Sequence, residues 1–123
     1  MDITALLKTA VASTDDTKTV MVLGGTPVTL HASPLTANDL KIIGRKHPDF
    51  MLRPNVEGMV DLLILKAKDD NGEKLFTLEH KPLLMRLSTN ITTGAFGDLF
   101  GEQLVSEDDD AQDARKGKSK ATS

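Results

Sequence analysis

The chain has 123 residues and a formal net charge of −3, and it contains no cysteine, tryptophan or tyrosine. The missing cysteine excludes a disulfide framework, thiol catalysis and cysteine-based zinc sites. The acidic balance and the scarcity of aromatic residues argue against nucleic acid as a partner, because nucleic-acid-binding proteins usually combine clustered Lys and Arg with stacking rings. We expect one small domain with a core of Leu, Ile, Val and Met.

The first predicted element is a short amphipathic helix over residues 2–12. Its apolar residues recur at helical spacing, and this stripe either packs on the body or contacts a partner. The segment lacks the basic start and apolar run of a signal peptide, and no stretch approaches the roughly 20 apolar residues of a membrane span. We therefore expect a cytoplasmic protein outside membranes. The stripe consists of Ile3, Leu6, Leu7, Ala10 and Val11.

A β-hairpin is predicted over about residues 19–31. Two β-branched runs flank Gly24-Gly25, a pair that suits a tight hairpin turn. Pro27 cannot donate a hydrogen bond to a ladder, so it belongs at the turn or on an edge. An isolated hairpin is marginal in water, so it must lean on helices or find further strands in another copy or a partner.

Two helices follow the hairpin. Thr36 is a good N-cap with Asp39 in the first turn, and Pro48 ends that helix. Asn55 caps the next helix, which runs to about Lys68 and is apolar on most sides. A helix of that kind is usually central in the core.

The later elements are predicted with less regular patterns. Residues 69–72 form a turn by their chemistry, and a further helix starts near residues 77–81, with Pro82 tolerated in its first turn. Residues 94–101 are a weak helix, because each of three glycines costs about 1 kcal/mol relative to Ala. From residue 106 the chain is acidic and then basic, without large apolar residues. Such a segment cannot bury enough surface to fold.

The sequence thus predicts an α+β fold: a mainly α-helical small domain over residues 1–105 with one N-terminal hairpin, and a disordered charged tail over 106–123. No motif for catalysis, metal or cofactor binding is found. His31, His47 and His80 lack metal-site spacing, and Gly24-Gly25 lacks the lysine of a phosphate-binding loop. The dense carboxylates Asp108–Asp110 lie in the tail, which cannot hold catalytic geometry. We expect no enzyme.

The order of these features resembles the tail assembly chaperones of bacteriophages with long non-contractile tails. The features are a hairpin of the form Val-x-Val-x-Gly-Gly-x-x-Val-x-Leu, the helix start Leu35-Thr36, an apolar helix ending in Lys68-Asp69-Asp70-Asn71-Gly72-Glu73-Lys74-Leu75-Phe76, and a helix opening near Thr77-Leu78-Glu79-His80. A short closing helix then leads into a charged tail. The resemblance spans roughly residues 19–123.

This resemblance implies a role in tail morphogenesis within the host cytoplasm. Proteins of this family bind the tape measure protein, keep it soluble and recruit tail tube subunits, and they are absent from the mature virion. Many have a longer form made by ribosomal frameshifting, and Lys116-Gly117-Lys118 is where a slippery codon run could lie. Multiple copies along one long client also suggest self-association.

An apolar groove for a helical client could be supplied by adaptable methionine and leucine side chains. We expect the partner-facing residues outside the strongest helical stripes; the same residues could also simply fill the core. They are Phe50, Met51, Leu52, Phe96, Leu99 and Phe100. The alternatives are a structural virion component, such as a neck or tail completion protein, and a small nucleic-acid-binding regulator.

Overall fold

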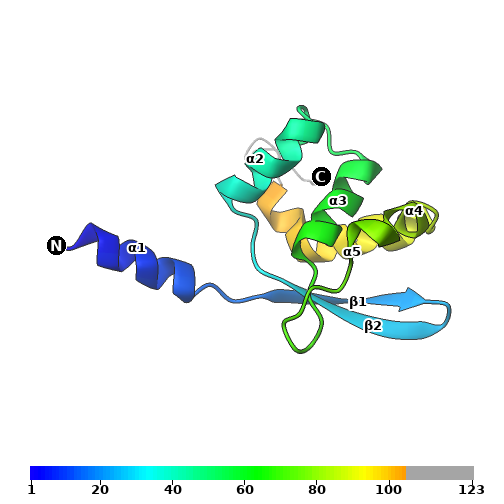
Figure 1. Ribbon diagram of the computed structural model, residues 1–123, viewed down its shortest axis with the longest axis horizontal. Helices are drawn as coiled ribbons and strands as arrows, with labels where there is room; N and C mark the ends of the chain where they lie inside the picture. The colour runs from blue at the N-terminus through cyan, green and yellow to red at the C-terminus, as the bar shows by residue number, and fades with distance from the viewer. Residues whose placement is uncertain (105–123) are drawn as a thin grey trace, which may run out of the picture.

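The computed structural model describes residues 1–104 and has a hairpin layer packed against a layer of helices (Figure 1). The described residues form five α-helices, one 3-10 turn and a two-stranded antiparallel hairpin, in agreement with the expected α+β class. The expectation of a disordered tail over 106–123 falls outside the described residues. In chain order the elements are α1 (Ile3–Ala12), β1 (Thr17–Leu23), β2 (Thr26–Ala32), α2 (Ala37–Lys46), α3 (Val56–Lys66), η1 (Leu78–His80), α4 (Lys81–Leu84) and α5 (Thr89–Leu104).

The hairpin is closed by a two-residue turn. Gly24 and Gly25 have φ angles of 58° and 83°. Positive φ at both central residues is what a type I′ turn requires, and that turn matches the twist of the flanking strands. In the register, Met21 pairs with Val28 and Thr19 with Leu30, and these two pairs face the helices.

The second strand is extended by single bridges. His31 and Lys68 exchange backbone hydrogen bonds of 2.9 and 2.7 Å, and Lys68 also bridges to Lys74. The loop after α3 thus adds a short bridged segment along the edge of β2. This partner explains how a hairpin that is marginal alone is held in place.

The first two helices of the helical layer begin with the predicted caps. Thr36 Oγ1 accepts from the Asp39 amide at 3.1 Å, and Asp39 Oδ2 accepts from the Thr36 amide at 3.0 Å, which completes a capping box for α2. Asn55 Oδ1 accepts from the Gly58 amide at 2.7 Å at the start of α3. Helix α3 is buried on several sides, as its sequence predicts.

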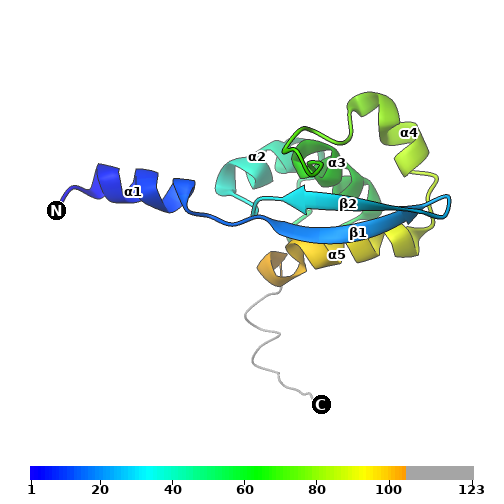
Figure 2. The same ribbon diagram turned by 90° about the horizontal axis from the view of Figure 1, so that it is seen from below.

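Helix α5 lies alongside β1 and is longer than predicted (Figure 2). The helix expected to start near residues 77–81 is short, since α4 ends at Leu84 and a separate helix, α5, begins at Thr89. The Ser88 carbonyl accepts from the amides of Ile91 and Thr92 at 3.0 and 3.3 Å, so Ser88 stands at the new helix start. Thr19 Oγ1 donates to Asp98 at 2.7 Å and ties β1 to α5.

The core lies between the hairpin and helices α2, α3, α4 and α5. It includes Met21, Leu30 and Ala32 from the hairpin, and Val60, Leu62, Leu63 and Ile64 from α3. Helix α1 contributes nothing to it: none of its residues is buried, and it projects away from the body (Figures 1 and 2).

Candidate functional site

Four of the six residues expected to face a partner are core residues. Phe50, Phe96, Leu99 and Phe100 are all buried, and only Met51 and Leu52 are exposed, Leu52 by 84%. The structure therefore places four of the expected residues in the core, the second role considered for them, and leaves Met51 and Leu52 as the exposed members of the set.

The three phenylalanines pack on one another. The rings of Phe50 and Phe96 meet edge to face with centroids 5.9 Å apart, and Phe96 and Phe100 lie 5.4 Å apart. Edge-to-face pairs of this kind add to the stabilisation from burial. The sequence did contain an indication of this burial. Residues 96, 99 and 100 follow the helical i, i+3, i+4 spacing of an apolar stripe, and the helix is long enough to bury that stripe.

An apolar groove opens instead beside α4, at the turn end of the hairpin. Its volume is about 330 Å³, and His80 supplies its only polar side chain. We call it the leucine groove. It is lined by Leu23, Leu75, Phe76, His80, Leu83, Leu84 and Leu87.

The segment around α4 shapes this groove. The Thr77 amide donates to His80 Nδ1 at 2.9 Å, and the His80 ring lies edge-on to Phe76 with centroids 6.3 Å apart. Pro82 stands in the first turn of α4, where its missing N–H is tolerated. Leu84 then points into the core, whereas Leu83 remains 62% exposed on the groove. An aliphatic surface without converging polar groups suits apolar side chains of another chain better than a polar small molecule.

A second groove lies between α2 and α3. Its volume is about 310 Å³, and its lining mixes apolar residues with charged ones at the rim. Leu78, which is 75% exposed, borders it. The full lining is Ile42, Ile43, Lys46, Asp61, Ile64, Leu65, Lys74 and Leu78.

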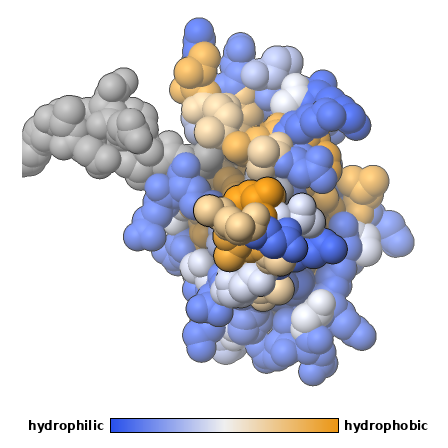
Figure 3. All heavy atoms as spheres, turned by 90° about the vertical axis from the view of Figure 1, so that its left-hand side faces the viewer, coloured by the Kyte–Doolittle hydropathy of each residue, from blue (hydrophilic) through white to orange (hydrophobic). Residues whose placement is uncertain are grey.

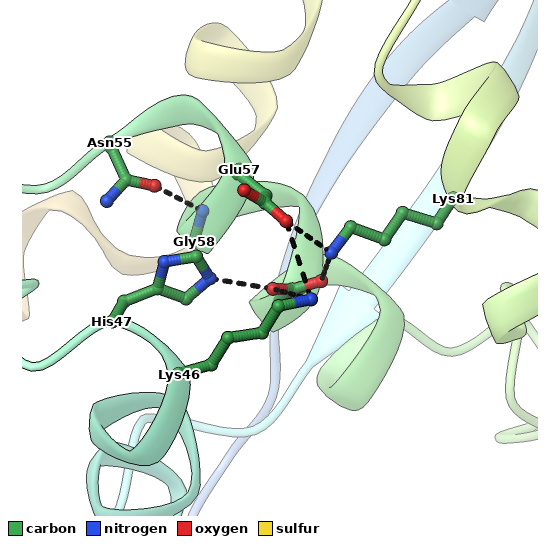
Figure 4. Close-up of polar contacts among 7 residues, drawn as sticks. Lys46, His47, Asn55, Glu57, Gly58 and Lys81 are labelled. Carbon is green, nitrogen blue, oxygen red and sulfur yellow. Dashed lines mark hydrogen bonds and ion pairs between the residues drawn. The ribbon is translucent and has the colours of Figure 1, made fainter.

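A cluster of charged side chains joins α2, α3 and α4 (Figure 4). His47 Nε2 lies 2.8 Å from Asp61 Oδ2. Lys81 Nζ lies 2.7 Å from Glu57 Oε2 and 2.9 Å from Asp61 Oδ1, and Lys46 Nζ lies 3.4 Å from Glu57 Oε2. Because Lys81 is the first residue of α4, the cluster fixes the helix that forms one wall of the leucine groove.

The electrostatics of the cluster favour its charged form. Burial alone raises the pKa of Asp61, but hydrogen bonds from His47 and Lys81 more than offset burial and hold that pKa below its usual value. Burial likewise lowers the pKa of Lys81, and its contacts with Glu57 and Asp61 raise it well above the usual lysine range. The ion pairs therefore persist at neutral pH.

Three side chains of the cluster are potential metal ligands. Ligand atoms of His47, Glu57 and Asp61 lie within 4.8 Å of one another. The ammonium groups of Lys46 and Lys81 already contact these carboxylates. A metal ion would have to displace both lysines, so the arrangement fits a structural ion-pair network better than a metal centre.

Comparison of the chain with protein-family models, with curated proteins and with solved structures gave no match. Within residues 1–104, none of the helices combines the length and the apolar character needed to cross a lipid bilayer. The described residues present an exposed aliphatic groove, and the ion-pair cluster fixes α4, which forms one wall of that groove. The sequence analysis missed the groove, because its lining combines Leu23 at the end of β1 with side chains from residues 75–87, which are distant in the sequence.

Proposed function

We propose that this chain is a tail assembly chaperone of long-tailed bacteriophages whose leucine groove binds an amphipathic helical segment of the tape measure protein. The observation that carries the proposal is the groove itself, a solvent-open surface of leucine side chains with one polar neighbour. The ordered resemblance of residues 19–123 to that family supports the choice of client.

The chemistry of the groove suits a helical client. An amphipathic helix places apolar side chains at i, i+3, i+4 and i+7, and such anchors fill aliphatic grooves on globular partners. Burying one large aliphatic side chain stabilises a complex by about 1.5–3 kcal/mol before the costs of association are subtracted. One groove therefore binds weakly, and many copies along a long client are needed to keep it soluble.

The remaining surface suits a solubilising role. The chain carries 33 acidic and basic residues, 18 Asp or Glu and 15 Lys or Arg, with a net charge of −3. A charged surface of mixed sign with nonzero net charge favours solubility. A client coated by such copies would present charge to water in place of its apolar stripe.

Co-expression with the tape measure protein tests the proposal. The wild-type chain should keep the client in the soluble fraction, and Leu83→Asp should send it to the pellet, because a carboxylate in the groove repels apolar anchors. Asn90→Asp is the matched control, since it adds a carboxylate at an exposed position outside both grooves. Circular dichroism must show both variants folded. Solubilisation that survives Leu83→Asp would contradict the groove as the binding site.

The location and partners proposed with this function have their own tests. A chaperone of this kind acts in the host cytoplasm and leaves before maturation, so mass spectrometry of purified particles should not detect it. Detection there would favour a neck or tail completion protein instead. Recruitment of the tail tube protein by a frameshifted longer form requires a slippery run at the codons for residues 116–118, which gene sequencing can check.

A further inference from the structure

Helix α1 presents an apolar surface that the rest of the described chain, up to residue 104, leaves uncovered. Its four large aliphatic side chains are 53–79% exposed. At 3.6 residues per turn, these residues and Ala10 occupy an arc of about 140°, and Lys8 lies outside that arc. Figure 3 views the molecule from the side to which α1 projects and shows apolar atoms gathered in the foreground. The four side chains are Ile3, Leu6, Leu7 and Val11.

The hairpin presents a second apolar surface, on the face turned away from the helices. Val20 and Val22 are 56% and 53% exposed. Their partners in the register are Thr29 and Pro27, so this outer face carries no charge along its central part. Neither valine lines the leucine groove.

The linker between α1 and β1, residues 13–16, is held by its own contacts. If α1 folded back onto its own hairpin, these contacts would have to break. Ser13 and Thr14 both donate hydroxyl hydrogen bonds to the Ala10 carbonyl, which prolongs the end of α1. Asp16 Oδ2 lies 2.9 Å from Lys68 Nζ, which fixes the start of β1. Only Asp15 remains between these anchors. Reversing a chain between a helix and a strand usually takes about 2–6 residues.

We propose that two copies of this chain associate by exchanging α1, so that the apolar side of each α1 packs on the outer hairpin face of the other copy. The exchange keeps the linker contacts, and it buries the apolar side of α1 and the outer hairpin face against each other. It also creates an isologous, two-fold interface, the commonest arrangement in homo-oligomers.

The size of the surfaces favours a reciprocal exchange. A ten-residue helix is about 15 Å long and is marginal in water on its own. One docked α1 covers only part of the roughly 1,600 Å² that a standard interface buries, whereas two arms and two hairpin faces come closer to that area. A second copy supplies both halves, which one helix of an unrelated partner does not.

Engineered cysteines test the exchange, since the natural chain has none. In the full-length chain, Leu7→Cys combined with Val22→Cys should form a disulfide-linked dimer under mild oxidation, visible on a non-reducing gel. The control combines Lys8→Cys with Val22→Cys and places one thiol outside the apolar arc, so it should form far less dimer. A disulfide within one chain, seen as lost thiols at monomer mobility, would overturn the proposal. Two thiols that stay free would overturn it as well.

Sedimentation velocity supplies a second readout without cysteines. Leu6→Asp should raise the dimer Kd by at least about tenfold, and Lys8→Ala should leave it unchanged. A wild-type chain that stays monomeric at high micromolar concentration would refute the exchange. Leu83→Asp lies in the leucine groove and should leave the dimer intact. Failure of the exchange and failure of the client-binding proposal are therefore seen in different experiments.

Discussion

The ammonium of Lys66 lies 2.7 Å from Asp39 Oδ2, and both side chains are largely removed from water, at 9% and 15% exposed. Lys66 also donates to Ser33 Oγ at 2.8 Å and to the Pro34 carbonyl at 3.1 Å. One lysine at the end of α3 therefore holds the connection from the hairpin and the first turn of α2.

Lys66→Met should destabilise the fold by about 3 kcal/mol, because it leaves the Asp39 carboxylate poorly solvated and without its ion-pair partner. Urea unfolding at neutral pH measures the change. Lys41→Met is the control, since Lys41 is exposed on α2, and it should cost less than about 0.5 kcal/mol. Equal losses for the two variants would show that the pair contributes nothing specific.

Acid should weaken the fold through Asp39 and Asp61. Burial raises the pKa of each, but ion pairing and hydrogen bonding outweigh it and leave both pKa values below the usual 3.8. The folded state therefore binds fewer protons than the unfolded state just below pH 4. The stabilisation is fully present above that pH and is lost as the pH falls through the folded pKa values.

Urea midpoints measured from pH 6 down to pH 2.5 check this dependence. The wild-type midpoint should fall steeply below about pH 4. Asp39→Asn removes one of the two groups, so its midpoint should start lower at pH 6 and fall less. A variant curve parallel to that of the wild type would contradict the role of Asp39.

Gly58→Ala should destabilise the fold. A Cβ at this position would lie 2.5 Å from Phe50 Cδ1 and 3.3 Å from Asn55 Oδ1. Since the Phe50 ring is fixed in the core against Phe96, relief of the clash requires repacking, which typically costs about 1–3 kcal/mol.

Gly97→Ala, on α5, should stabilise the fold, in contrast to Gly58→Ala. Among residues 1–104, no neighbouring side chain or segment comes within 4 Å of a Cβ there, and the residue is exposed in the middle of the helix. The substitution should raise stability by roughly 0.5–1 kcal/mol, the propensity difference between Gly and Ala in a helix. Thermal unfolding followed by circular dichroism distinguishes the two glycine variants by the sign of the Tm change.

Phe100→Asp should unfold the chain, because it places a carboxylate in a site that is 1% exposed. Met51→Asp, at an exposed position of the connector before α3, should change stability by less than about 0.5 kcal/mol. Far-ultraviolet circular dichroism and soluble yield compare the two. A folded, soluble Phe100→Asp variant would restore the idea that this part of α5 faces a partner.

Much of the fold could be predicted from local sequence signals. Gly24-Gly25 indicated the hairpin, and Thr36 and Asn55 indicated the starts of α2 and α3, because turn and cap chemistry act over only a few residues. The length of α5 was underestimated because glycine propensity is a weak term, which burial of Phe96, Leu99 and Phe100 overrides.

The candidate site could not be predicted from local sequence signals. The ion-pair cluster joins Lys46 to Lys81, and the leucine groove joins Leu23 to Leu87, so both depend on tertiary packing. The scarcity of aromatic residues led to the expectation of a core of Leu, Ile, Val and Met, but all four phenylalanines are buried in it. Three of these phenylalanines were expected to face a partner because they lie outside the strongest helical stripes, whereas the structure buries them among the largest side chains of the core.

The end of α5 lies on the opposite side of the domain from the leucine groove. Gln103 accepts from the Leu35 amide at 3.0 Å and donates to the Leu35 carbonyl at 3.3 Å, which docks the last turn of α5 beside the start of α2. The 16-residue helix is about 24 Å long, and its other end adjoins Leu87. A reporter or affinity handle fused directly after this helix would start far from the groove, so it should leave the groove open to solvent.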